Sequence, residues 1–181
     1  MTVEELKRKD IGFHSDTFLS QVNYIVKKVY TSITLEELPN VKHFMSNSCY
    51  ENYENIEKQN KLNHIKTVYE QINVTSNIYD IYEEENYFWI IVYTRVQLVE
   101  YDISVTTGKL VRGKKNQRNG HLLQVSLKKK KTATSTIVNR CVGCGNSFNI
   151  YENSTCPKCG RVYDLENFDY IVDSIEEIVY E

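Results

Sequence analysis

Hydrophobic residues in the first third of the chain recur with the period of an α-helix. Between residues 18 and 33 they are spaced three or four apart, with one adjacent pair, so they form one apolar stripe. The stripe holds Phe18, Val22, Ile25, Val26, Val29 and Ile33. Ser15 or Asp16 can cap the start of this helix. The pattern predicts a helix that faces the core, preceded by a charged leader over residues 1–12 that we expect to be loose.

A second helix is predicted to begin at Ser46 or Ser48 and to end near Leu62. Pro39 separates it from the first helix, because proline interrupts helical hydrogen bonding. The face that we expect to be buried holds Cys49, Tyr53 and Ile56.

From His64 onward the pattern becomes that of β-strands. Aromatic and β-branched residues dominate from Ile65 to Tyr82, a turn is expected over residues 83–86, and a long strand or two joined strands follow from Tyr87 to Ile103. Alternation along this run gives it two faces. Phe88, Ile90, Val92, Val96 and Leu98 share one face, and Trp89, Tyr93, Arg95, Gln97 and Tyr101 share the other.

Two further signals complete the predicted sheet. Thr107-Gly108-Lys109 is typical of a hairpin turn, and His121 to Leu127 alternates as a strand. Helices followed by an antiparallel sheet indicate an α+β fold.

Four cysteines near the C-terminus predict a metal site. Cys141 and Cys144 form one Cys-x-x-Cys pair, Cys156 and Cys159 form another, and eleven residues separate the pairs. Four thiolates suit one structural Zn²⁺, and iron in a rubredoxin-like site is the alternative. The motif contains no ligand position for water or substrate, so we expect no catalysis there. Two disulfides are the other possibility, but no secretory signal precedes the cysteines.

Length and composition are those of a folded protein with one main domain and a small module. The chain has 181 residues, of which 41% are hydrophobic and 12% aromatic. No stretch reaches the roughly 20 apolar residues of a membrane helix, and we predict a cytoplasmic protein. The predicted division is a leader (1–12), an α+β domain (13–131), a linker (132–136), a zinc ribbon (137–165) and an acidic tail (166–181).

Charge is distributed unevenly along the chain. Ten basic residues and no acidic one lie between Ile103 and Tyr151, whereas the last eighteen residues contain seven acids and no base. The basic residues expected to be exposed are Lys114, Lys115, Arg118, Lys128, Lys129, Lys130 and Lys131. The two blocks can bind outside partners of opposite charge, or they can pair with each other.

Several segments resemble the family named for subunit 44 of the mitochondrial inner-membrane translocase, the Tim44-like family. They are Phe18-Leu-Ser-Gln-Val, Phe88-Trp-Ile-Ile-Val, the segment from Tyr101 to Gly113, and the ribbon followed by Phe168-Asp-Tyr-Ile-Val-Asp-Ser-Ile. The resemblance runs from about Phe13 to Ile178. It implies a cone-like domain of the nuclear transport factor two-like kind, with helices in the concave side of a curved antiparallel sheet. It implies a scaffold or interaction role and supplies no catalytic residues.

Three functions compete on the sequence alone. The first is an interaction module whose basic stretch guides an unknown protein partner, or meets an anionic membrane surface from the periphery. The second is nucleic-acid binding through the ribbon and the four adjacent lysines, although the sequence pI near 6.1 argues against it. The third is a pocket that binds or transforms a small molecule. The four histidines have no carboxylate partner by spacing, and Cys49 is expected to be a buried structural thiol.

Overall fold

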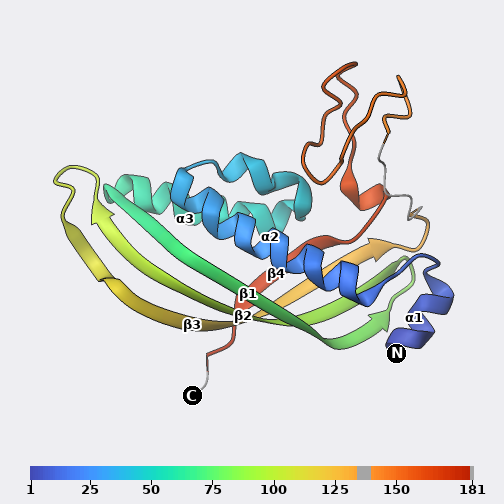
Figure 1. Cartoon of the computed structure of the whole chain (residues 1–181), viewed down its shortest axis with the longest axis horizontal. Coiled ribbons are helices and arrows are strands. Elements are labelled where there is room, and N and C mark those ends of the chain that lie inside the picture. Colours follow the sequence, from blue (N-terminus) through green and yellow to red (C-terminus); the bar gives the residue numbers. More distant parts are fainter. Residues whose placement is uncertain (134–139, 180–181) are drawn as a thin grey trace.

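The apolar stripe of the long N-terminal helix lies against the concave face of a curved antiparallel sheet (Figure 1). The structure, a computed structural model, describes residues 1–133 and 140–179. Three α-helices, α1 (Val3–Lys9), α2 (Ser15–Leu35) and α3 (Asn47–Leu62), precede the sheet, and a 3-10 helix, η1 (Leu38–Phe44), joins the last two. The expected α+β class is confirmed.

Helix α2 buries the predicted stripe. Phe18, Val22, Ile25, Val26 and Val29 are buried, and Ile33 packs against the same core. In α3 the side chain of Ser46 caps the helix by accepting a hydrogen bond from the amide of Cys49. Cys49 is buried, as expected, but Ile56 is 54% exposed, because α3 contacts the rest of the protein along a narrower face than its sequence suggested.

Four strands form the sheet in the order β1-β2-β3-β4, and every neighbouring pair is antiparallel. They are β1 (Ile65–Glu83), β2 (Tyr87–Ser104), β3 (Leu110–Lys130) and β4 (Ile171–Glu177). The predicted hairpin joins β2 to β3, with Gly108 at a φ of 68°. The apolar face of β2 predicted from alternation is the one that faces the helices.

Residues 1–12 are better ordered than the leader expected from their charge. Thr2 and Glu5 form a reciprocal capping box at the start of α1, and Leu6 is fully buried in the main core. The N-terminal ammonium also donates a hydrogen bond to the carbonyl of Ile81 at 2.8 Å. This segment is therefore part of the α+β domain.

The acidic tail expected over residues 166–181 contains the fourth strand of the sheet. β4 pairs with β3 from Leu123 to Lys128, and its first residues, Ile171 and Val172, are buried. A short 3-10 helix, η2 (Leu165–Asn167), precedes the strand. The ribbon is consequently an insertion between β3 and β4, and it projects from one end of the molecule on the helix side (Figure 1). Much of the linker predicted at 132–136, and the start of the predicted ribbon, lie outside the described residues.

Candidate functional site

The two cysteine pairs sit on two backbone turns with the same hydrogen bonds. The carbonyl of Cys141 accepts from the amide of Gly145 at 2.8 Å, and the carbonyl of Cys156 accepts from the amide of Gly160 at 2.9 Å. The two glycines have φ angles of 70° and 73°, in the left-handed region that favours glycine. The repeated turn therefore explains why a glycine follows each pair.

The turns bring four sulfur atoms together. The Sγ atoms of Cys141, Cys144, Cys156 and Cys159 all lie within 4.8 Å of one another. Cys141 Sγ is 3.5 Å from Cys159 Sγ, and Cys144 Sγ is 3.8 Å from Cys156 Sγ. Four sulfurs at about 2.3 Å from one ion lie about 3.8 Å apart at the corners of a tetrahedron. The cluster fits a single metal ion and a zinc ribbon. All five cysteines of the chain are free in the structure, which therefore contains neither of the two disulfides considered as the alternative.

Tyr163 supports the cluster from inside the ribbon. Its hydroxyl accepts a hydrogen bond from the amide of Val142 at 2.9 Å and lies 3.1 Å from Cys141 Sγ. This contact, with the nearby backbone amides, lowers the pKa of the Cys141 thiol to about 6. The thiolate is the form that binds a metal. The Tyr163 ring packs against Phe148, which is also buried, so the ribbon has a small apolar core beneath its sulfurs.

Polar contacts join the ribbon to the α+β domain. His43 Nε2 lies 3.2 Å from the carbonyl of Tyr151, and the Tyr151 hydroxyl donates to Asp169. The hydroxyl of Tyr87 on β2 donates to Glu166 at 3.0 Å. The buried ribbon residues also belong to the same apolar cluster as α2 and the sheet. The ribbon is therefore packed onto the domain.

The run from Lys128 to Lys131 is engaged by carboxylates of the chain itself. Lys128 pairs with Asp173 at 2.6 Å, Lys130 with Glu166 at 3.5 Å, and Lys131 with Glu83 at 3.2 Å. Lys129 pairs with Asp10 at 2.8 Å, and its side chain is only 2% exposed. Two of these acids, Glu166 and Asp173, come from the acidic C-terminal block, so that block pairs internally. The four lysines therefore do not form the exposed patch that we expected. Lys129 is buried and Lys128 and Lys130 are partly buried in β3, whereas Lys131, just after the strand, is exposed.

A model of the Tim44-like domain matches residues 1–131 of the chain. The protein belongs to the Tim44-like domain family. The match includes α1 and ends at the last residue of the lysine run, so it is shifted from the resemblance expected between Phe13 and Ile178. The ribbon and β4 lie beyond it. A search of curated proteins found no match.

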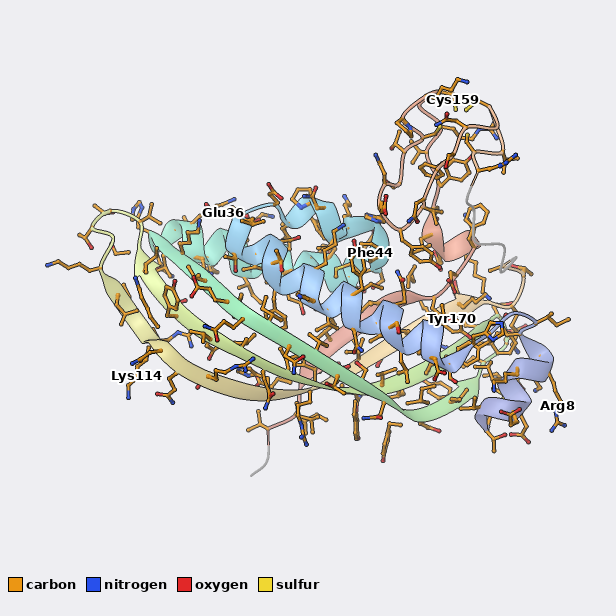
Figure 2. The ribbon with its side chains drawn as sticks, in the orientation of Figure 1. Arg8, Glu36, Phe44, Lys114, Cys159 and Tyr170 are labelled. Carbon is orange, nitrogen blue, oxygen red and sulfur yellow. The ribbon has the colours of Figure 1, made fainter. Side chains whose placement is uncertain are left out.

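Half of β3 is a free edge of the Tim44-like domain. β4 pairs with β3 only from Leu123 to Lys128, and among the described residues no strand pairs with the outer edge from Leu110 to His121. Every residue from Leu110 to Arg118 is exposed. Lys114, Lys115 and Arg118 lie here, and Figure 2 shows Lys114 projecting from this edge. They are thus the predicted partner-binding residues that remain accessible.

One histidine of the Tim44-like domain has two carboxylate partners that sequence spacing did not reveal. His121 Nδ1 is 2.6 Å from Glu177 Oε1, and His121 Nε2 is 3.3 Å from Glu100 Oε2. Burial raises the pKa of nearby Tyr69 to about 12, and the Glu100 charge adds to this effect. The three members of this group come from β2, β3 and β4, so their proximity follows from the register of the sheet and not from their spacing in the sequence. The group ties the end of β4 to the sheet.

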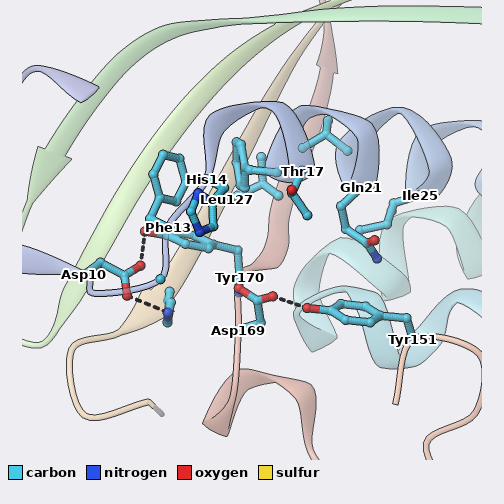
Figure 3. A pocket seen from close by; sticks show the side chains of 14 residues that line it. Asp10, Phe13, His14, Thr17, Gln21, Ile25, Leu127, Tyr151, Asp169 and Tyr170 are labelled. Carbon is cyan, nitrogen blue, oxygen red and sulfur yellow. Dashed lines mark hydrogen bonds and ion pairs between the residues drawn. The ribbon is translucent and has the colours of Figure 1, made fainter. Parts of the chain in front are cut away.

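A mostly apolar cavity of about 180 Å³ opens between α2, the end of β3 and the ribbon. Its walls include Phe13, Phe18, Val22, Ile25 and Leu127. Figure 3 shows Thr17 and Gln21 on one side of the cavity, with Tyr151 and Asp169 opposite them.

No helix among residues 1–133 and 140–179 is both long and apolar enough to cross a membrane.

Proposed function

We propose that this protein is a non-catalytic interaction module in which one zinc ion fixes the ribbon and the free edge of β3 receives a protein partner. The four cysteine sulfurs would hold the zinc, and a filled tetrahedral thiolate site leaves no position for substrate. The metal would replace the large apolar core that a segment this short cannot build. We expect the protein to act in the cytoplasm.

The observation that carries the proposal is the exposed, unpaired outer edge of β3. Its backbone amides and carbonyls can hydrogen-bond to an extended segment of another chain, which then becomes an additional strand. Natural proteins commonly protect such edges with lysines or a covering loop. Here the lysines are present, whereas no covering segment lies over the edge among the described residues.

Charge indicates which segment the edge would receive. From Leu110 to His121 the chain contains Arg112, Lys114, Lys115 and Arg118 and no acidic residue. Arg112 is already paired with Asp102 at 2.7 Å. Among the described residues no carboxylate pairs with the other three basic side chains, although Arg118 donates a hydrogen bond to the carbonyl of Gln71, so these three supply the uncompensated positive charge. An extended acidic segment is the complementary partner, because opposite charges accelerate association and exclude wrong partners.

Nucleic-acid binding is the less supported alternative. Its strongest sequence signal was the run of four lysines, and each of these is engaged by a carboxylate of the same chain. The anionic membrane surface is a third possible contact for the same basic edge.

Partner capture from the protein's own cells tests the proposal. The test variant carries Lys114→Glu, Lys115→Glu and Arg118→Glu. The control carries Arg8→Glu, Lys27→Glu and Arg95→Glu, which change the charge equally at exposed positions on other elements. We expect a protein that is retained by the wild type and the control and reduced about tenfold by the edge variant.

Three results would count against the proposal. Equal loss from both variants would indicate a nonspecific charge effect, and no loss from either would leave the edge without a role. Recovery of mainly nuclease-sensitive material would favour the nucleic-acid alternative.

The metal is tested by elemental analysis of the purified chain and of Cys156→Ser. We expect about one zinc per chain in the wild type and loss of zinc in the variant. Stoichiometric iron with the absorption of iron thiolates would instead identify a rubredoxin-like site.

A further inference from the structure

The cavity between α2 and the ribbon combines an apolar body with a few polar groups. Its aromatic walls come from Phe13, Phe18, Tyr151 and Tyr170. Three charged side chains line it, namely Asp10, Lys129 and Asp169. Cavities of this kind are typical of small-molecule sites, in which apolar walls supply most of the contact and polar groups fix the orientation.

Asp10 and Lys129 form an ion pair that is internally satisfied. Lys129 Nζ donates to Asp10 Oδ1 at 2.8 Å, and the hydroxyl of Tyr170 donates to Asp10 Oδ2 at 3.1 Å (Figure 3). Lys129 Nζ also lies 5.4 Å from the centre of the Tyr170 ring. The opposite charges cancel, so this pair gives the cavity no net charge.

Asp169 is the charge that remains. It accepts hydrogen bonds from the hydroxyl of Tyr151 and from the amide of Tyr170, and no lysine, arginine or histidine among the described residues forms an ion pair with it. Burial raises the pKa of this carboxyl. The two hydrogen bonds and the charge of Lys129 oppose that effect only in part, and the charge of Asp10 adds to it. A carboxylate whose direct hydrogen bonds all come from neutral donors, in a largely apolar site, favours a cation as an additional partner.

Gln21 lines the same cavity with a buried amide nitrogen, Nε2, that has no hydrogen-bond partner among the described residues. The amide lies on the α2 side of the cavity, facing the wall that holds Tyr151 and Asp169 (Figure 3). An unsatisfied buried amide costs free energy unless a bound molecule or water pairs with it, so this side chain also indicates an occupant.

We propose that this cavity binds a small aromatic amine, whose ammonium group pairs with Asp169 and whose ring packs among the aromatic and aliphatic side chains of the walls. An ammonium at this position would also lie close to tyrosine rings, which attract cations. The volume is suitable, because a cavity of about 150 Å³ accommodates benzene. The cavity of about 180 Å³ therefore has room for a benzene ring with a short aminoalkyl arm.

Three probes of similar shape test the charge preference: phenethylamine, phenethyl alcohol and hydrocinnamate. Each is titrated into the metal-loaded full chain and followed by ligand-observed NMR and calorimetry. We expect phenethylamine to bind about tenfold more tightly than the alcohol, because it adds a charge-assisted hydrogen bond. Hydrocinnamate should bind least, because its carboxylate faces Asp169. Equal binding of the amine and the alcohol, or no binding of the amine, would overturn the proposal.

The matched variants are Asp169→Asn and Asp80→Asn. Both aspartates accept a hydrogen bond from the next backbone amide at 2.8 Å, but Asp80 is exposed on β1, away from the cavity. Asp169→Asn should weaken phenethylamine binding about tenfold and leave phenethyl alcohol unchanged. Asp80→Asn should change neither. An unaltered affinity for the amine in Asp169→Asn would refute the role of this carboxylate.

The pH dependence of the wild type provides a test that needs no variant. Protonated Asp169 cannot pair with an ammonium group, so phenethylamine binding should weaken as the pH falls through the raised pKa of this carboxyl. Phenethyl alcohol should bind equally across the same range. Parallel pH profiles for the two probes would contradict the proposal.

Discussion

Replacing Lys129 with methionine should destabilise the protein far more than the same change at Lys131, two residues further along. The Lys129–Asp10 pair is almost completely buried, with side chains 2% and 6% exposed. The Lys131–Glu83 pair has side chains 31% and 36% exposed. Methionine keeps most of the stem and removes the charge, so the comparison isolates the ion pair in two environments.

The expected magnitudes follow from this burial. Removing one partner of a buried ion pair costs about 3–5 kcal/mol, because the remaining charge has lost its solvent and its counterion. An exposed pair contributes about 0–1 kcal/mol. Since small domains are stable by about 5–15 kcal/mol, Lys129→Met should remove a large part of the free energy of unfolding.

The double variant Lys129→Met/Asp10→Leu measures the coupling. Apolar replacement of both partners leaves no buried charge and should restore much of the lost stability. Restoration should be incomplete, because the hydroxyl of Tyr170 loses its acceptor on Asp10.

Urea unfolding of the metal-loaded proteins gives these free energies. Trp89 is the single tryptophan of the chain and lies on β2, so its fluorescence reports on the sheet while far-UV circular dichroism reports on the helices. The reasoning is refuted if Lys129→Met costs as little as Lys131→Met, or if the double variant costs the sum of its single changes.

Three further predictions concern other elements. Leu6→Ala should lower the free energy of unfolding in urea by about 2–5 kcal/mol, because Leu6 is 0% exposed. A change near zero would instead support a loosely attached segment over residues 1–12. Gly113→Ala should cost more than about 1 kcal/mol by the same measurement, because an added Cβ would lie 2.4 Å from a β2 carbonyl at a φ of 80°. Gly120→Ala, with nothing within 4 Å, should be nearly neutral. Burial raises the pKa of Asp169, so between the unfolded and the folded pKa the folded state binds more protons than the unfolded state, and stability falls as the pH rises through this range. Asp169→Asn should reduce this pH dependence in thermal unfolding measured from pH 4 to 8.

Local periodicity was sufficient for the helices and the long strands. The stripe of α2 and the alternation of β2 depend on neighbours within a few residues, and both lie where the pattern predicted. The capping box of α1 was also readable, because Thr2, Glu5 and the following Leu6 form its signature. The abundance of charge around these residues masked that signal.

The lysine run shows where local reasoning fails. Alternation with Val125 and Leu127 places Lys129 on the concave face, so its inward direction could have been predicted once the strand was extended. Its burial could not, because a buried lysine requires a partner, and Asp10 lies 119 residues away in the sequence. The same limit applies to His121, whose carboxylates lie on two other strands.

The position of the ribbon between β3 and β4 changes how its role must be studied. A chain ending after β3 would lose the cysteine cluster and also β4, the strand that covers part of β3, so the free edge of the sheet would become longer. Any binding lost or gained by such a chain would therefore have two explanations. Substitution of one cysteine of the cluster keeps β4 in the chain, and the β4 residues Ile171 and Val172 are buried against the sheet. The Tyr151 hydroxyl of the ribbon also donates a hydrogen bond to Asp169, so we expect a change in the fold of the ribbon to alter the lining of the cavity. The ribbon and the last strand thus act as one structural unit, although the family model ends before both.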